Sequence, residues 1–217
     1  MLIVIFATCF LLLCNWFQIT SFVYALSHPK KRVSYVHDAW MTKTILGKTG
    51  INITEFTFFE TKKLFGMMPS TFPLKPKMIL SRGIYEAFNK DELEWVLLHE
   101  IGHYTLMHGI KLGIAQFSLL FFGLYTIYDI SSEFVAVFLS LLLGFLYIQF
   151  HKHIELEADT YSISRTSNPK GVITAQEKLV KFNGINEKSF VTRYLKSQVL
   201  PSQRIAMASA RIKKESL

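Results

Sequence analysis

The chain has 217 residues, which suits one main domain with appended elements. Half of the residues are hydrophobic, phenylalanine alone occurs 19 times and the mean hydropathy is +0.28, which is too apolar for an ordinary soluble domain and indicates a membrane protein. The formal net charge is +8, and the two cysteines, Cys9 and Cys14, lie in one apolar stretch, which excludes a disulfide framework and a cysteine-based metal site.

The first 27 residues contain no Asp, Glu, Lys or Arg, and we expect residues 1–27 to form a transmembrane helix. The alternative is a cleaved signal peptide, because Val23-Tyr24-Ala25 resembles a small-residue cleavage site. No basic residue precedes the apolar run, and Lys30-Lys31-Arg32 follows it, which favours an uncleaved anchor.

The next segment, residues 28–111, has mixed character, and we assign it to the first half of a catalytic domain. Residues 55–59 and 77–81 carry aromatic and branched side chains typical of short strands. The prolines between them indicate irregular connections. Residues 83–88 are expected to form a short helical turn.

A helix with clear boundary signals is predicted to follow this turn. Asn89 can cap its N-terminus, and Glu92, three residues later, completes the pattern of a capping box. Asp91 and Glu94 place negative charge near the positive end of the helix. Gly109 is placed to end it.

Two uncharged runs of 17 residues follow, at 112–128 and 134–150. Each would be roughly 25 Å long as a helix, the short end of what spans a bilayer. Residues 129–133 are just long enough to reverse the chain, so we predict a transmembrane helical hairpin over residues 112–150. The alternative, two buried helices of a soluble protein, is disfavoured by the Phe, Leu and Ile content of both runs.

The basic residues are distributed asymmetrically about these runs. Residues 28–111 and 151–217 carry 12 Lys and Arg each, whereas residues 1–27 and the turn at 129–133 carry none. Three spans place both basic segments on one side of the membrane, which the positive-inside rule makes the cytoplasmic side. We therefore expect an integral protein of the cell membrane with its N-terminus outside and its catalytic domain facing the cytoplasm.

Residues 151–217 are predicted to form two or three helices and to be the second half of the catalytic domain. The last helix is expected to place its basic side chains on solvated faces, namely those of Arg204, Arg211, Lys213 and Lys214. Together the elements predict a mainly α protein with a small β element, an α+β fold in which the hairpin interrupts the catalytic domain.

The helix after Asn89 carries the sequence His99-Glu100-Ile101-Gly102-His103. Residues four apart share a helix face, so the two imidazoles point in one direction at a spacing that suits two ligands of a tetrahedral zinc. Glu100 can take the proton of a water that zinc activates and pass it to the leaving amine. Two histidines that only line a polar face are the alternative, which is disfavoured because the pattern arises by chance in roughly one percent of chains of this length.

A catalytic zinc needs a third protein ligand and an open fourth position. A hairpin that returns to the same membrane face brings a group of candidates to the motif helix: His151, His153, Glu155, Glu157 and Asp159. Glu155 and Asp159 share a helix face, so one can bind the metal while the other supports an imidazole. The residues alone leave open which carboxylate does which.

Two histidines, His37 and His108, are expected to have no part in the metal site. His108 is five residues beyond His103 and points about 140° away around a continuous helix. His37 lies far from the motif in the sequence. His151 and His153 are candidates for assisting the transition state, and the alternative for both is a position near the lipid headgroups.

The two motifs, His99 to His103 and Glu155-Leu156-Glu157-Ala158-Asp159 after the hairpin, resemble the HtpX-like and CAAX prenyl endopeptidase family of membrane zinc metalloproteases. The resemblance covers roughly residues 70–210 and implies a zincin-like catalytic domain. It assigns the third zinc ligand to Glu155 and the supporting carboxylate to Asp159. Glu157 falls on a variable position, for which it implies a solvated or structural role.

Two flanking segments resemble the same family. Residues 77–88 are similar to a strand and turn that precede the motif helix, and the resemblance implies that an edge strand there binds substrate as an added strand. Residues 201–205 are similar to a late element in which His-Pro precedes an Arg. Here Leu200 stands where that His would be, so Arg204 is a candidate helper near the oxyanion, with a surface or packing role as the alternative.

The expected function is that of a zinc-dependent endopeptidase that binds one Zn²⁺ per chain through His99, His103 and Glu155, with Glu100 as the base. The expected partners are protein or peptide substrates, namely membrane or misfolded proteins at the cytoplasmic face, and membrane lipid, with no nucleic acid. One alternative is a non-proteolytic membrane sensor or scaffold that retains the fold. Another is a sensor that cuts one dedicated regulator.

Overall fold

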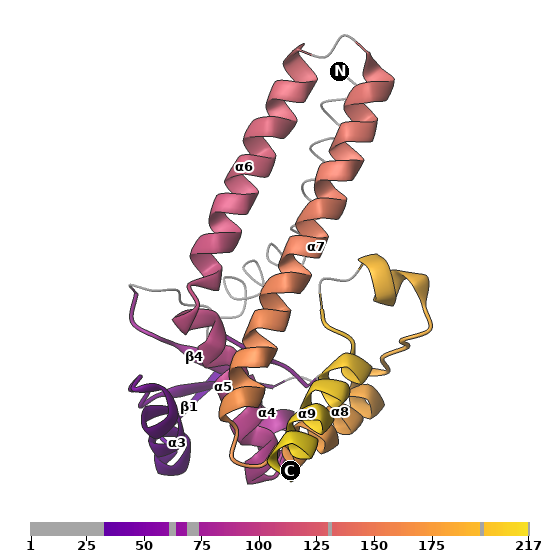
Figure 1. The fold of residues 1–217 in the computed structure, drawn as a ribbon. Coiled ribbons are helices and arrows are strands. Elements are labelled where there is room, and N and C mark those ends of the chain that lie inside the picture. Colours follow the sequence, from indigo (N-terminus) through magenta and orange to yellow (C-terminus); the bar gives the residue numbers. More distant parts are fainter. Residues whose placement is uncertain (1–32, 61–63, 69–73, 130–131, 196–197, 217) are drawn as a thin grey trace.

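The computed structural model describes residues 33–60, 64–68, 74–129, 132–195 and 198–216, and helices predominate in them (Figure 1). A small sheet accompanies the helices, so the predicted mainly α fold with a small β element is confirmed. The predicted transmembrane helix at residues 1–27, with its alternative cleavage site, lies outside the described residues.

The sheet has four strands in the order β1 (Val33–Val36), β2 (Phe56–Phe59), β4 (Met78–Ser81) and β3 (Gly66–Met67). β1 pairs antiparallel with β2, β2 pairs parallel with β4, and β3 pairs antiparallel with β4. The two strands predicted from aromatic and branched residues are therefore confirmed. β4 is not the predicted edge strand, because the two-residue strand β3 pairs along its outer side.

The motif helix α5 (Lys90–Thr105) contacts α3 (Ala39–Thr49), α7 (Glu133–Arg165) and α8 (Lys170–Asn183). It lies in the middle of the part of the structure that the sheet and the helices packed around α5 form, which we call the body. The short helix α4 (Arg82–Ala87) precedes it, as predicted. The capping box is present: the Asn89 side chain accepts from the backbone N–H of Glu92, and the Glu92 side chain accepts from the backbone N–H of Asn89. Nearly every residue of α5 after this first turn is buried.

α5 ends earlier than predicted. The chain leaves the helix at Leu106, and Met107 adopts a left-handed conformation with φ of 55°. The next helix, α6 (His108–Asp129), then begins at an angle of 55° to α5. Gly109 therefore lies inside α6 rather than at a helix end, because the left-handed turn at Met107 has already broken the run of helical hydrogen bonds.

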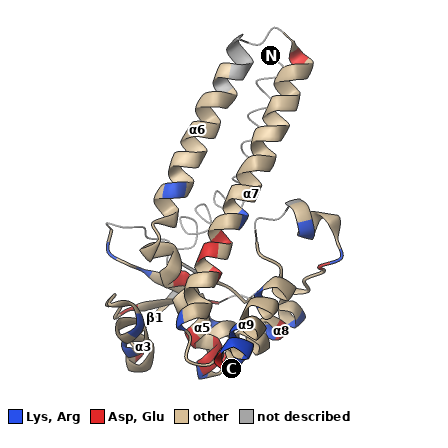
Figure 2. Ribbon diagram, in the orientation of Figure 1, with Lys and Arg blue, Asp and Glu red and all other residues tan. Residues whose placement is uncertain are grey.

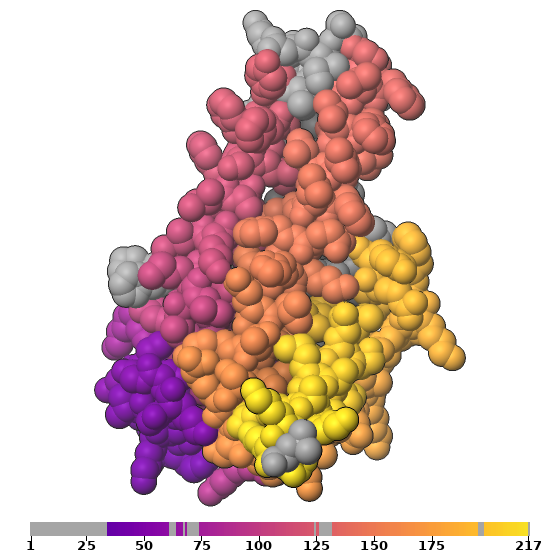
Figure 3. Space-filling view, in the orientation of Figure 1, coloured from indigo at the N-terminus to yellow at the C-terminus, as the bar shows by residue number. Residues whose placement is uncertain are grey.

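α6 and α7 (Glu133–Arg165) lie side by side in opposite directions and project from the body as a long arm (Figures 1 and 3). α7 runs without a break for 33 residues. It therefore joins the apolar run at 134–150 and the candidate ligands that follow it into one rigid element.

The outer part of this arm is apolar and exposed. Phe117, Phe121 and Phe134 are more than 60% exposed, and Lys and Arg are nearly absent from the projecting half of both helices (Figure 2). Among the described helices, α7 alone is long and apolar enough to cross a membrane, and α6 passes the same test only together with α5 as a bent pair. The hairpin geometry is thus present, and its position in a bilayer is part of the proposal below.

The C-terminal part contains α8 (Lys170–Asn183), a short π-helix at Val191–Leu195 and α9 (Pro201–Glu215), in keeping with the predicted two or three helices. α8 packs on α5, and α9 packs on α8 and α7. Lys213 and Lys214 are solvated as predicted, whereas Arg204 is not. Its side chain turns inward toward α7.

Candidate active site

The site forms where α5 and α7 cross closely. A Cβ atom on Gly102 would lie 3.2 Å from Cδ1 of Tyr161 and 3.4 Å from Cα of Ala158, whose own side chain is fully buried. The small residues of the two motifs therefore let the helix backbones approach. This approach places His99 and His103 opposite Glu155 and Asp159.

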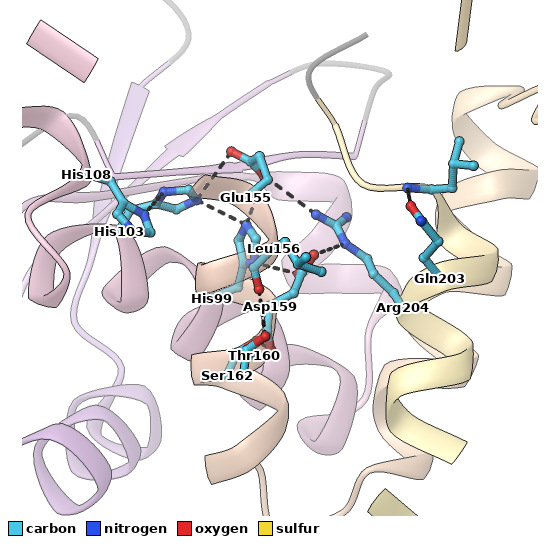
Figure 4. Close-up of polar contacts among 11 residues, drawn as sticks. His99, His103, His108, Glu155, Leu156, Asp159, Thr160, Ser162, Gln203 and Arg204 are labelled. Atoms are coloured by element: carbon cyan, nitrogen blue, oxygen red, sulfur yellow. Dashed lines mark hydrogen bonds and ion pairs between the residues drawn. The ribbon is translucent and has the colours of Figure 1, made fainter. Parts of the chain in front are cut away.

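Three side chains aim potential ligand atoms at one point, and these atoms all lie within 4.8 Å of one another. Nε2 of His99 is 3.2 Å from Nε2 of His103, and these two atoms lie 3.6 and 3.5 Å from the Glu155 carboxylate oxygens (Figure 4). Ligands of a tetrahedral zinc at about 2.0–2.1 Å lie roughly 3.3 Å apart. The set of two imidazoles and one carboxylate thus fits a zinc ion in chemistry and spacing.

Asp159 supports this set from behind. Its Oδ1 lies 2.9 Å from Nδ1 of His99, the ring nitrogen that faces away from the other ligands. Asp159 is fully buried, and the Arg204 guanidinium compensates its charge, because Nε of Arg204 donates to Oδ2 at 2.7 Å. A second guanidinium nitrogen is 3.6 Å from Glu155. The structure therefore joins Arg204 to both carboxylates, as Figure 4 shows.

His108 lies in this cluster, contrary to the sequence expectation. Its Nδ1 is 2.9 Å from Nδ1 of His103, and its Nε2 is 3.1 Å from Oε2 of Glu157. The expectation assumed a continuous helix, and the turn at Met107 carries His108 back toward His103 instead. Glu157 also accepts from Lys111 at 2.7 Å and is not one of the three residues whose potential ligand atoms meet.

Glu100 is buried next to β3, one of the two edge strands of the sheet. A Cβ atom on Gly66 of β3 would lie 2.8 Å from Oε1 of Glu100, so the carboxylate occupies space that only a glycine leaves open. Sequence reasoning did not select Gly66. No motif marks it, since its importance arises from a contact between segments 34 residues apart.

The other two histidine candidates contribute less. The His153 side chain is 65% exposed, and its Nε2 lies 3.6 Å from Glu157 rather than near the ligand set. His151 is one helical turn before Glu155, with its ring against Tyr147. His37 contacts the backbone of Thr54, away from the site.

Burial and neighbouring charges shift the pKa values of the side chains in the site, some upward and some downward. Burial raises the pKa of Glu100 to about 7, which suits a group that takes and returns a proton. Burial also lowers the pKa of His103 to about 3 and so favours the neutral, metal-binding imidazole. Burial opposes the charged form of His99 as well, but the carboxylates of Asp159 and Glu155 outweigh it and raise the pKa of His99 to about 10.

The chain is similar to a known protein family and to a solved structure. The sequence pattern of peptidase family M48 matches residues 65–212. The crystal structure of S. mikatae Ste24p has a similar fold, with a TM-score of 0.64 and 15% identity over 95% of this chain and 57% of that chain. This chain thus spans little more than half the length of that protein. The comparison of this chain with curated proteins found no match. Because the family pattern covers well over half of the chain and includes both motifs, the chain belongs to peptidase family M48, a family of zinc metalloproteases.

Proposed function

We propose that the chain is a zinc-dependent endopeptidase that hydrolyses peptide bonds of membrane or misfolded proteins at the cytoplasmic face of the cell membrane. The observation that carries the proposal is the convergence of His99, His103 and Glu155 at tetrahedral spacing, with Glu100 beside them. We assign one Zn²⁺ to these three ligands. Membership of family M48 supports the reaction class.

The residues divide the chemistry among them. Zinc, when bound, lowers the pKa of water to about 7 and polarises the carbonyl that is attacked. Glu100 takes the proton of the attacking water and delivers it to the leaving amine, which requires a carboxyl pKa near neutrality. Asp159 holds the His99 ring in the orientation that presents Nε2, and Arg204 holds Asp159.

The edge of the sheet gives the substrate a place to bind. β3 is the edge strand on the side of the motif helix, and its Gly66 lies against Glu100. An extended peptide that pairs with β3 as an added strand would pass its backbone directly by the proposed base. This mode requires an unfolded or locally extended substrate, which supports misfolded and membrane proteins as the substrate class.

The distribution of charge supports the membrane setting. The projecting halves of α6 and α7 are apolar and exposed, whereas charged residues gather on the body that contains the site (Figure 2). Contiguous exposed apolar surface is uncommon on soluble monomers and marks a site of interaction with a membrane or a partner. With the described Lys and Arg residues concentrated on the body, the positive-inside rule favours a cytoplasmic position for it.

The test compares Glu100→Gln with the wild-type protein in detergent, using casein as an unfolded substrate and measuring bound zinc. The exposed Glu177→Gln on α8 is the matched control. We expect Glu100→Gln to retain zinc and to lose at least about 100-fold in kcat, because general acid–base catalysis contributes that much. We expect the control to keep full activity and chelation of zinc to abolish it.

Two results would contradict the proposal. One is activity that survives both the Glu100→Gln change and removal of zinc. The other is a wild-type protein that binds zinc but cuts neither casein nor a membrane-anchored substrate, which would favour the non-proteolytic alternative.

A further inference from the structure

A chain of polar contacts leads away from the site on the side opposite Asp159. It runs from Nδ1 of His103 to Nδ1 of His108 at 2.9 Å, and from Nε2 of His108 to Oε2 of Glu157 at 3.1 Å. Lys111 donates to the same Glu157 oxygen at 2.7 Å and fixes its position. The His108 side chain is 1% exposed, so this imidazole has no access to bulk water.

The contacts define where each hydrogen resides. If His103 binds zinc through Nε2, the atom that faces His99 and Glu155, then its hydrogen is on Nδ1. His108 must accept that hydrogen bond at its own Nδ1, which leaves its hydrogen on Nε2. The Glu157 carboxylate accepts from that nitrogen. Every donor in the chain therefore has an acceptor, in one arrangement of hydrogens.

We propose that His108 is a positioning residue for the zinc ligand His103, in the way that Asp159 is for His99. The inference rests on the zinc site proposed above and adds a second orienting group to it. His108 holds the His103 ring in one orientation and in the tautomer that leaves Nε2 free for the metal. A group that orients a metal-bound imidazole contributes about 10–100-fold to metal affinity.

The same contacts tie the ligand to the base of the helical arm. His108 is the first residue of α6, Lys111 lies one turn further along it, and Glu157 belongs to α7. The left-handed Met107 aims His108 at the site, since a continuous α5 would carry it away. A backbone conformation that few non-glycine residues adopt thus coincides with a specific side-chain contact at the ligand.

The test compares two replacements of His108 that differ in hydrogen bonding. His108→Phe keeps a buried ring but has no acceptor for His103. His108→Gln offers an amide oxygen to His103 and an amide N–H to Glu157, at a separation similar to that of the two ring nitrogens. Zinc affinity is measured by competition with a chromophoric chelator, and ligand geometry by the visible spectrum of the cobalt-substituted protein.

We expect His108→Phe to bind zinc about 10–100-fold more weakly than wild type, with an altered cobalt spectrum, and His108→Gln to stay within about threefold. Unchanged affinity in His108→Phe would overturn the inference, and so would an equal loss in both variants, which would indicate packing alone. If His108→Phe does not fold, Glu157→Leu, which removes the acceptor for His108, provides the test. We expect Glu157→Leu to weaken zinc binding, and unchanged zinc affinity in this variant would overturn the inference.

The experiment separates this inference from the proposed function. A wild-type protein that binds no zinc, or a His103→Ala variant that binds it normally, would overturn both. Normal zinc binding and activity in the wild type, together with an unaffected His108→Phe variant, would overturn the positioning role alone.

Discussion

The Glu100 carboxylate lies so close to the Gly66 backbone that even one Cα hydrogen of Gly66 matters. Replacing it with a methyl group in Gly66→Ala must displace the carboxylate, because the new Cβ would lie 2.8 Å from Oε1. We expect kcat to fall at least about tenfold with zinc content unchanged, since a displacement of about 1 Å in a catalytic group can cost 100-fold. Casein hydrolysis and metal analysis measure the two effects.

Gly47→Ala on α3 is the control, since a Cβ there has no neighbour within 4 Å. Full activity in Gly66→Ala would show that the carboxylate adapts, and would remove the requirement for glycine at this position.

Spacing alone predicted the residues whose neighbours are fixed by a helix. His99 and His103 share a face because they are four apart, and the same holds for Glu155 and Asp159, which the structure places together. Sequence reasoning on His108 and Gly66 failed for a different reason. One enters the site through a left-handed turn, and the other through the approach of an edge strand, and neither event leaves a periodic pattern.

Arg204 is an intermediate case. The family resemblance made it a candidate, but its charge favoured a solvated position, since Arg is rarely buried. The structure shows why burial is tolerated: Asp159 and Glu155 together compensate the guanidinium. The burial of Arg204 depends on Asp159, which is 45 residues away and cannot be identified as its partner from the local sequence.

At the scale of helices, the crossing of α5 and α7 depends on small side chains. Ala158→Leu would add three carbon atoms to a fully buried position against Gly102. We expect it to lower the free energy of unfolding by about 1–3 kcal/mol and to weaken zinc binding, because separating the helices separates the ligands. Thermal unfolding and chelator competition measure both effects.

The exposed Ala210→Leu on α9 is the matched control and should change neither quantity. A stable Ala158→Leu variant with wild-type zinc affinity would contradict the role assigned to the crossing.

The junction of α5 with α8 makes a prediction about pH. Glu92 is buried and accepts from Lys178 at 2.6 Å. Burial raises the pKa of Glu92, but Lys178 and the backbone N–H of Asn89 more than offset this and hold it below 4.5. A depressed carboxyl pKa in the folded state stabilises the protein above the unfolded pKa, and this contribution is lost as the pH falls through the folded value.

We therefore expect Lys178→Met to lower the free energy of unfolding by about 1–2 kcal/mol at pH 7 and by less below pH 4. Denaturant unfolding of the zinc-free protein at both pH values, with the exposed Lys170→Met as control, measures the difference. An equal loss at both values would show that the lysine stabilises by packing alone.

Helix boundaries show how far local rules extend. The start of α5 was predicted to the residue because a capping box is a local pattern. Its end was predicted two residues too late, because Gly109 gives a local signal while the left-handed turn that ends the helix occurs at Met107. Tertiary contacts of His108 and Lys111 accompany that turn, and a local signal cannot report them.

At the scale of the whole molecule, the proposed topology predicts which sites an external reagent reaches. In a chain whose Cys9 and Cys14 are replaced by Ser, we introduce Glu133→Cys at the tip of the arm or Lys188→Cys on the body, both exposed. In intact cells, a membrane-impermeant maleimide should label Cys at the tip. It should label Cys on the body only after permeabilisation, because three spans place the body in the cytoplasm.

The reverse labelling pattern would show that the protein has the opposite orientation in the membrane. Labelling of both positions in intact cells would show that the arm does not cross the membrane.

The unbroken course of α7 has a consequence for where a substrate is cut. The apolar run ends at Phe150, and the proposed third ligand, Glu155, lies five residues later on the same unbroken helix. With α7 embedded as proposed, this fixes the reaction centre at roughly 7.5 Å of helix rise beyond the apolar run. We therefore expect a membrane-anchored substrate to be cut at a set distance from its own anchor, whatever its sequence there.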